Sequence, residues 1–240
     1  MSSNSSSDLS SNHSYNLRKN IKSRVSNKSI ESMNPAKKKR RVKKKAPELP
    51  RKLVFFDLET TGFNPYSCEI IEIAAKMICP KDPNHELYFE RLVKPSFPIS
   101  SYISKITGIT NEMVSKSATI DVVLKEFKKF IGDAKEIILI AHNCNGFDRL
   151  FLEKGFSNFQ IHHSPYIYLD TMRMAQYILP KRYSHSLQKL CEYFSIIQKN
   201  PHRARSDVEN LVSLYERLLL LFSKICGVKD SLKILALISI

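Results

Sequence analysis

The pattern of apolar and polar residues changes abruptly at Leu53. Residues 1–34 are rich in Ser and Asn and contain few large apolar side chains, whereas from Leu53 onward apolar runs recur at the spacing of strands and helices. Three such runs, residues 53–58, 69–78 and 86–94, follow one another closely. They predict an antiparallel meander of three strands.

Helices and further strands alternate after the meander. A loop containing Thr107, Gly108 and Ile109 is expected first, and then a helix over 119–131, whose apolar positions fall on one face. Residues 136–141 and 166–170 are typical of two more strands, with helices expected from about Phe147 and over 171–178, 186–194 and 207–225. This order predicts an α/β fold, with a mixed five-stranded sheet flanked by helices.

Charge is distributed very unevenly along the chain. The net charge is +15, and residues 1–52 hold 15 of the 38 basic residues but only three of the 23 acidic ones. We therefore predict three parts: a disordered basic tail (1–52), a folded domain (53–226) and an apolar C-terminal extension (227–240). The extension is too short for a membrane anchor, so we expect it to pack on the domain or to form an oligomer contact.

Eight of the nine residues from Lys37 to Lys45 are cationic. This run fits a signal for a nuclear-import receptor or an arm that holds phosphates non-specifically, and a solvated charge run without a partner is the third interpretation. The first residues lack the apolar segment of a secretory signal, and the five cysteines form no CxxC pair. We expect a nuclear or otherwise cytoplasmic protein with reduced thiols.

Asp57 and Glu59 are the first residues that indicate chemistry. They lie two apart at the end of a predicted strand, so both carboxylates project from the same face. Adjacent carboxylates repel each other unless a cation lies between them, which makes the pair suited to Mg²⁺ or Mn²⁺. Acidic residues at a strand end are also commonly just solvated.

A second group, residues 141–148 (AHNCNGFD), follows the buried strand 136–141. His142 and Asn143 should lie at the end of that strand, and Asp148 should begin the next helix. Ligands bind at this edge of an α/β sheet, so Asp148 can face the first two carboxylates. Its simpler role is to complement the positive end of the helix.

The third group is HRARSD, residues 202–207. Ser206 and Glu209 have the spacing of a capping box, which predicts Ser206 as the N-cap and Asp207 as the first helical residue. His202 would then lie in the preceding loop, either as a surface histidine or as part of a site with Asp207.

Taken in order, these groups resemble the DEDDh exonucleases, the family of the proofreading subunit of bacterial DNA polymerase III, ribonuclease T and the three-prime repair exonucleases. The matching residues are Asp57 and Glu59, Asp148 within HNxxxFD, and His202 with Asp207 in HxAxxD. The resemblance extends from about Leu53 to Cys226. It implies a ribonuclease-H-like fold and 3′-to-5′ removal of nucleoside 5′-monophosphates by two Mg²⁺ ions, with Mn²⁺ as a substitute.

The resemblance also implies residue roles. The four carboxylates would hold the metals, and His202, with an ordinary pKa near 6.5, would deprotonate the attacking water. The nucleic acid would be contacted by the turn after the first strand, by the second group and by His202; the residues are Leu58, Thr60, Thr61, Gly62, Asn143, Phe147 and His202. For Phe147, packing within the helix is an equally good interpretation.

Three residues separate Asn143 from Phe147, a spacing that is more similar to the three-prime repair branch than to the proofreading subunits. This spacing favours DNA as the substrate, in the form of single-stranded or frayed 3′ ends. An RNA-trimming exonuclease is the alternative within the fold, because no residue visibly tests for a 2′-hydroxyl. A non-catalytic nucleic-acid-binding module would be expected to lose a carboxylate, and none is lost here. The sequence does not distinguish a free enzyme from a polymerase subunit.

Overall fold

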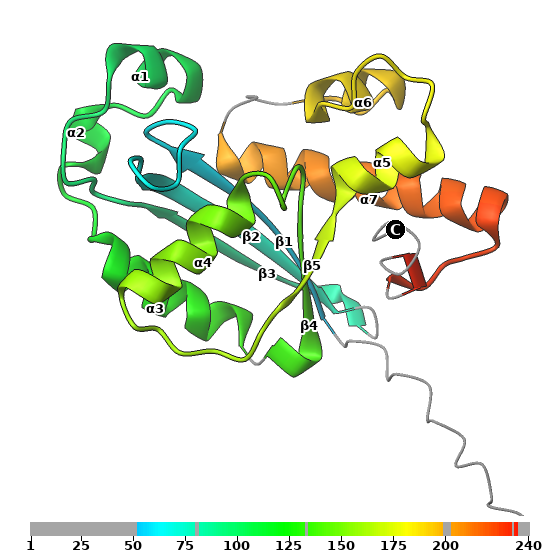
Figure 1. The fold of residues 1–240 in the computed structure, drawn as a ribbon, viewed down its shortest axis with the longest axis horizontal. Coiled ribbons are helices and arrows are strands. Elements are labelled where there is room, and N and C mark those ends of the chain that lie inside the picture. The colour runs from blue at the N-terminus through cyan, green and yellow to red at the C-terminus, as the bar shows by residue number, and fades with distance from the viewer. Residues whose placement is uncertain (1–51, 80–81, 133, 199–202, 232, 235–240) are drawn as a thin grey trace, which may run out of the picture. The chain divides into compact units, whose positions relative to one another are not determined.

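A computed structural model describes residues 52–79, 82–132, 134–198, 203–231 and 233–234 of the chain (Figure 1). The predicted tail, apart from Lys52, lies outside these residues, and so does the basic run 37–45. His202 also lies outside them.

One mixed sheet of five strands, in the order β3-β2-β1-β4-β5, forms the centre of the domain. Strands β1 (Lys52–Thr60), β2 (Ile70–Cys79) and β3 (Asp82–Leu92) form the predicted antiparallel meander. Strand β4 (Ile137–Ala141) runs parallel to β1, and β5 (Ile167–Asp170) runs parallel to β4. The mixed α/β sheet is confirmed, and β1 begins one residue earlier than predicted.

Helices cover both faces of the sheet (Figure 1). Helices α3 (Ile120–Ile131) and α4 (Asp148–Asn158) pack on one face, and α5 (Thr171–Ile178) and α7 (Ala204–Cys226) pack on the other. The short helix α6 (Leu187–Tyr193) joins the second layer through Leu190. A single 3-10 turn, η1 (Ala134–Glu136), precedes β4.

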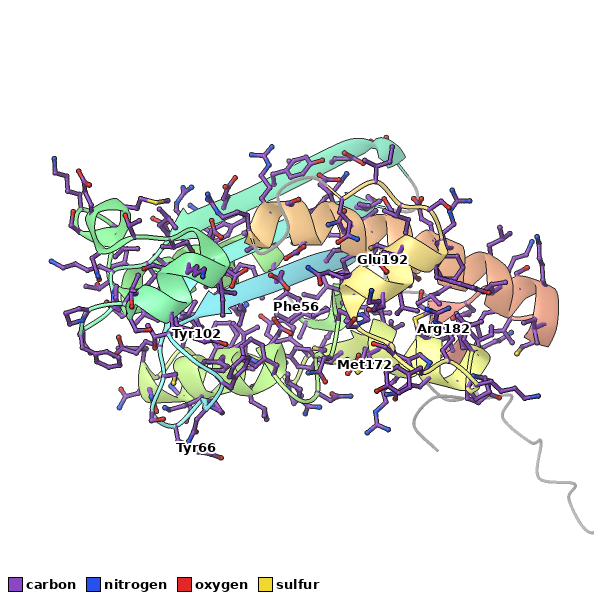
Figure 2. All side chains as sticks on the ribbon, turned by 90° about the horizontal axis from the view of Figure 1, so that it is seen from above. Phe56, Tyr66, Tyr102, Met172, Arg182 and Glu192 are labelled. Carbon is purple, nitrogen blue, oxygen red and sulfur yellow. The ribbon has the colours of Figure 1, made fainter. Side chains whose placement is uncertain are left out.

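The side chains of β1 alternate between these two layers, which decides where the acidic pair points. Val54, Phe56 and Leu58 belong to the core under α3 and α4, and Figure 2 shows Phe56 in the interior. Phe55 belongs to the core under α5 and α7. Because strand residues two apart share a face, Asp57 and Glu59 project towards the α7 side of the sheet.

One local prediction holds in part and another was wrong. The expected loop is present at Gly108 and Ile109, but Thr107 is the last residue of α1 (Ser101–Thr107), which ends at Gly108 with φ +72°, and the short helix α2 (Asn111–Val114) follows. Helix α7 begins at Ala204, so Ser206 lies inside its first turn and Arg203 is the N-cap. Glu209 pairs with Lys76 at 3.2 Å instead of completing a capping box, because the buried ammonium of Lys76 requires a carboxylate.

The described part of the C-terminal extension packs on the domain. Ile234 is fully buried with residues of α5 and α7, and the hydroxyls of Tyr215 and Ser231 are 2.8 Å apart. No described helix combines the length and the apolar character that crossing a bilayer requires. The extension thus adds to the second layer of the core, as the packing interpretation predicted.

Candidate active site

Three of the four predicted carboxylates meet at one end of the sheet. Asp57 and Glu59 come from the end of β1, and Asp207 comes from the first turn of α7. One carboxylate oxygen from each lies within 4.8 Å of the other two, and all three side chains remain partly exposed. Asp57 and Asp207 are 150 positions apart in sequence. They come together because Asp57 and Glu59 project towards the layer that contains α7.

Asp148, the fourth carboxylate, begins α4 and lies beside Asp57. It is only 2% exposed, and its charge is the largest electrostatic contribution that raises the pKa of Asp57. Its Oδ1 atom is buried and has no hydrogen-bond partner among the described residues. A buried carboxylate oxygen without a partner is costly, so this atom requires a cation or a proton.

The acidic residues raise one another's pKa. For Asp57 and Asp148 burial is the main cause of the increase, and hydrogen bonds from the backbone of Asp148 and Leu58 partly offset it at Asp148. Burial, followed by the charges of Asp207 and Glu72, raises the pKa of Glu59 to about 8. In the absence of a cation, therefore, the raised pKa values of Asp57, Glu59 and Asp148 favour their protonated forms.

These observations fit a divalent cation site. Mg²⁺ and Mn²⁺ prefer carboxylate oxygens, and the cluster offers four carboxylates, one of which has an oxygen without a partner. A bound cation would remove the repulsion that raises the pKa values, because it favours the ionised forms. Asp57, Glu59, Asp148 and Asp207 are the residues that would hold it.

A fifth carboxylate, Glu72, lies under the cluster and fixes the start of α7. It is completely buried on β2, directly opposite Glu59 in the β1–β2 register. Its Oε1 accepts a hydrogen bond from Arg203 Nη2 at 2.9 Å, and its Oε2 accepts one from the backbone N–H of Ala204 at 3.1 Å. Glu72 thereby attaches the helix that carries Asp207 to the strand beside the one that carries Glu59.

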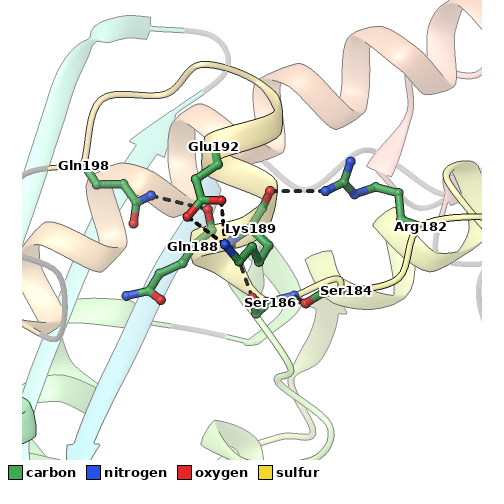
Figure 3. A network of polar contacts seen from close by, with 7 residues as sticks. All are labelled: Arg182, Ser184, Ser186, Gln188, Lys189, Glu192 and Gln198. Atoms are coloured by element: carbon green, nitrogen blue, oxygen red, sulfur yellow. Dashed lines mark hydrogen bonds and ion pairs between the residues drawn. The ribbon is translucent and has the colours of Figure 1, made fainter.

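Polar contacts around α6 hold the segment that leads towards residues 199–202 (Figure 3). The hydroxyl of Ser186 caps α6 by accepting from the backbone N–H of Lys189, and Lys189 pairs with Glu192 at 2.8 Å. Gln198 Nε2 donates to the carbonyl of Gln188 at 3.3 Å. The chain is thus anchored at Gln198 and again at Arg203, on either side of His202.

The turn after β1 is stabilised mainly by its own contacts. Thr60 Oγ1 donates to the carbonyl of Gly62 at 2.6 Å, and the Thr61 N–H donates to the carbonyl of Glu69 at 2.8 Å. A Cβ on Gly62 would come within 2.7 Å of Cys68 Sγ, so the glycine is required by the turn itself. Leu58 is buried in the core, which leaves only its backbone for contact with a ligand.

Phe147 and Asn143 lie at the start of α4. Phe147 packs on Phe151 with ring centroids 5.0 Å apart, as the packing interpretation predicted, and on Phe63 at 6.3 Å. Phe63 is 78% exposed, and no periodicity indicated it. Asn143 adopts φ +60°, a conformation that Asn tolerates better than most residues, and its side chain lies over Gly146.

Asp170 and His142 stabilise the loop that precedes Asp148. The carboxylate of Asp170 accepts hydrogen bonds from the backbone N–H groups of Asn143 (3.0 Å), Asn145 (3.1 Å) and Met172 (2.9 Å). His142 lies between Thr171 Oγ1 (2.9 Å) and the carbonyl of His185 (2.8 Å). Because burial lowers the pKa of His142, its ring is neutral and supports the loop without taking part in the acidic cluster.

Three supporting residues, Glu72, Arg203 and Asp170, were not singled out from the sequence. Glu72 did leave a signal, because it is a charged residue inside the apolar run EIIEIAAKMI, where a carboxylate requires a buried partner. Arg203 left none, because its partner Glu72 is distant in sequence. Asp170 lies in the segment LDT (169–171), which is similar to a segment of the DEDDh family, but nothing in the sequence indicates its backbone partners.

Comparisons with known proteins agree with this geometry. The exonuclease family model RNase_T matches residues 54–215. The DNA polymerase III PolC-type of Halalkalibacterium halodurans is 36% identical over 165 residues, which are 68% of this chain but only 11% of the polymerase. The chain therefore corresponds to about a tenth of this relative.

Two solved structures share the fold at low sequence identity. E. coli exonuclease I in complex with a dT13 oligonucleotide superimposes with a TM-score of 0.63 at 16% identity, over 73% of this chain and 42% of that one. The nuclease domain of 3′hExo, a DEDDh family member bound to rAMP, superimposes with a TM-score of 0.61 at 20% identity, over 73% of this chain and 94% of that one.

Proposed function

The chain belongs to the RNase_T exonuclease family, and from this premise we propose that it is a metal-dependent 3′-to-5′ exonuclease that releases nucleoside 5′-monophosphates from DNA ends. The observation that carries the proposal is the convergence of Asp57, Glu59 and Asp207, with the unpartnered oxygen of Asp148 beside them. Family membership alone would also fit a domain that has lost its chemistry. A complete and electrostatically strained acidic cluster favours a working site.

The carboxylates have the role of metal ligands in this proposal. Two divalent cations would activate a water and stabilise the leaving 3′-oxygen. Asp57 and Glu59 are fixed by β1, Asp148 by α4 and Asp207 by α7, so elements of both layers hold the ligands in place. Glu72 keeps the start of α7 against the sheet, which preserves the position of Asp207.

His202 is proposed as the general base that takes the proton of the attacking water. His202 directly precedes Arg203 in the chain. Because Arg203 is bound to Glu72 under the acidic cluster, the chain reaches the cluster immediately after His202. An ordinary histidine pKa near 6.5 leaves the ring mostly neutral at pH 7 and therefore able to accept a proton.

DNA is proposed as the substrate because the polymerase relative is a DNA polymerase by name and one structural neighbour was solved with dT13. RNA is a second candidate, because the 3′hExo domain was solved with rAMP. The activity of the whole polymerase is not carried over, since the match spans only about a tenth of it.

The test uses matched single-stranded DNA and RNA oligonucleotides, each labelled at either end, with Mg²⁺, Mn²⁺ or EDTA. A 3′-to-5′ exonuclease shortens the 5′-labelled strand stepwise and releases a labelled mononucleotide at once from the 3′-labelled strand. Asp207→Asn serves as the catalytically impaired control, and Arg217→Gln, on the exposed side of α7, as the matched active one. No shortening of any strand with either metal contradicts the proposal, and faster shortening of RNA reverses the choice of substrate.

We also propose that the basic run Lys37–Lys45 directs the protein to the nucleus, although it lies outside the described residues. Replacing its eight cationic residues by Gln and Ser in a fluorescent fusion of the full chain should abolish nuclear accumulation. An unchanged distribution contradicts import. Weaker binding to DNA would instead support a phosphate-binding arm.

A further inference from the structure

A large open groove lies along the outer side of α4, beside the acidic cluster. Its volume is about 1130 Å³, and its lining extends from Tyr66 in the β1–β2 loop, past Arg149 and Lys154 on α4, to Arg173 on α5. Arg149 follows Asp148 directly, so the groove begins within the first turn of the helix that carries this member of the cluster. Pockets that enclose one small ligand have volumes of ~300–1,000 Å³, so this open groove suits a longer ligand.

The lysine and the two arginines of the groove have no acidic partners in the part of the chain that the structure describes. No carboxylate among the described residues forms a salt bridge with Arg149, Lys154 or Arg173. Arg149 reaches only the amide oxygen of Asn145, at 3.4 Å, and Lys154 donates to the carbonyl of Pro65. By contrast, Lys76 on β2 and Arg203 at the start of α7 are both paired with glutamates.

The acidic residues of the groove are already engaged. Glu153 accepts a hydrogen bond from Tyr168 Oη at 2.6 Å and lies 3.5 Å from His163 Nε2. Asp170 uses both carboxylate oxygens for backbone N–H groups. The three cations outnumber the two carboxylates in the lining, so the groove keeps a net positive charge that favours an anionic ligand.

Aromatic rings lie under two of the cations. The guanidinium of Arg149 is 4.9 Å from the ring centroid of Tyr168, and the ammonium of Lys154 is 5.6 Å from that of Tyr66. Tyr66 is 85% exposed, and Figure 2 shows it at the outer edge of the molecule. Tyr168 is buried, so Tyr66 is the ring of this pair that a base can reach. Cations beside an exposed aromatic ring are the combination that binds single-stranded nucleic acid, by phosphate contacts and base stacking.

We propose that this groove binds the single strand upstream of the terminal nucleotide, with its phosphates on Arg149, Lys154 and Arg173 and a base on Tyr66. The inference rests on the proposed function for the identity of the ligand. It adds a second binding region, outside the acidic cluster, that holds the substrate between successive cleavages. The lining of the groove contains none of the four metal-binding carboxylates.

Binding is measured without catalysis, in EDTA, by fluorescence anisotropy of a labelled DNA strand of about 12 nucleotides. The full chain is compared with the triple variant Arg149→Gln, Lys154→Gln, Arg173→Gln. Each phosphate contact contributes about 0.7 to the slope of log Kd against log salt for single strands, so the triple variant should lower the slope by about 2 and raise Kd at low salt by at least about tenfold. Arg217→Gln, a cation on the exposed side of α7, is the matched control.

Tyr66→Ala tests the stacking contact separately, and about 1–3 kcal/mol, or roughly 5–150-fold in Kd, is expected for one stacked base. With Mg²⁺, the ratio of kcat/KM on the 12-nucleotide strand to kcat/KM on a dinucleotide should fall by about fivefold or more in the triple variant. An unchanged Kd and salt slope overturn the inference, and so does an equal loss on both substrates. If the full chain binds the strand through the groove but hydrolyses neither substrate, only the proposed function fails.

Discussion

Glu72 and Arg203 join strand β2 to the first residues of α7, with 2.9 Å between Oε1 and Nη2. The glutamate is completely buried, whereas the arginine side chain is 36% exposed. The second oxygen of Glu72 holds the N–H of Ala204, one of the N–H groups that a helix start leaves without an intrahelical partner. This contact connects the strand next to Glu59 with the helix that carries Asp207, so it controls the distance between two members of the acidic cluster.

Replacing Glu72 by Ala should affect both stability and catalysis. The change leaves the Ala204 N–H and part of the Arg203 guanidinium without a partner, which costs about 1–3 kcal/mol of unfolding free energy. Small displacements of catalytic groups cost up to about 10²-fold in rate, so we expect kcat to fall by about tenfold or more, with a smaller change in KM. Urea denaturation and steady-state kinetics provide the two measurements.

Glu72→Gln and Glu90→Gln are the controls for this prediction. Glutamine keeps an oxygen for the Ala204 N–H, so it should recover part of the loss in kcat. Glu90 forms an exposed pair with Arg205 at 2.9 Å, and its replacement should change stability by less than about 1 kcal/mol. Equal kcat values for Glu72→Ala and the wild type would show that the contact does not position the cluster.

Asp57 and Asp170 are predicted to respond in opposite ways to replacement by Asn. Asp57 is repelled by Asp148, Glu59 and Asp207, so its neutral replacement should stabilise the metal-free protein. It should also lower kcat by about 10²–10³-fold, the loss typical of an electrostatic catalytic group.

Asp170 instead binds three backbone N–H groups. Asp170→Asn should therefore lower the unfolding free energy by about 1–2 kcal/mol, because these hydrogen bonds are made to a charged acceptor. Thermal unfolding in EDTA compares the two variants. A destabilised Asp57→Asn protein would mean that the acidic cluster is not strained in the metal-free state.

The difference between these two aspartates shows which features of the site could be predicted from the sequence and which could not. Both residues lie in the C-terminal half of a strand of the same sheet, and spacing in the sequence does not distinguish a repelled carboxylate from a satisfied one. The strands and the mixed sheet were predictable from periodicity, and the alternation of strand faces places Asp57 and Glu59 side by side. That Asp207 joins them was implied by the family resemblance.

What could not be predicted depends on contacts between distant segments. The partner of Glu72 is 131 residues away along the chain, and Glu209 was expected to cap α7 but is taken by Lys76 on β2. The start of α7 was predicted at Asp207, but the helix begins at Ala204, where the distant Glu72 binds Arg203 and the N–H of Ala204. Leaving a buried charge without a partner costs more free energy than losing a helix cap. Where one side chain could do either, the pairing with the buried charge therefore prevails.

The raised pKa values of the acidic cluster predict how stability depends on pH. The folded metal-free protein keeps protons that the unfolded chain has already lost, between roughly pH 4.3, the ordinary pKa of Glu, and about pH 8, the pKa of Glu59. Since the unfolded state then binds fewer protons, the free energy of unfolding should fall steadily as the pH rises through this range and should level off above about pH 8, where Glu59 is ionised in the folded state as well.

Mg²⁺ should counteract this loss, because it binds the ionised carboxylates of the folded state. The increase in Tm caused by saturating Mg²⁺ is therefore expected to be larger at about pH 8.5 than at about pH 5.5. Differential scanning fluorimetry at constant ionic strength measures it, with Asp57→Asn as the variant in which the increase should shrink. The same Tm increase at both pH values would show that Mg²⁺ binds elsewhere.

His142 and His202 should be separable by one pair of substitutions. His142 lies half-buried between Thr171 and the carbonyl of His185, so His142→Ala leaves a fully buried hydroxyl and a carbonyl without this partner and should cost about 1–3 kcal/mol of unfolding free energy. His202→Ala should leave Tm within the range of surface substitutions and lower kcat by about 10²–10⁴-fold, the contribution of a general base. His142→Gln, which retains a donor and an acceptor, should recover part of the stability. A His202→Ala protein with normal kcat would require another base, and it would leave the acidic cluster as the only catalytic part of the site.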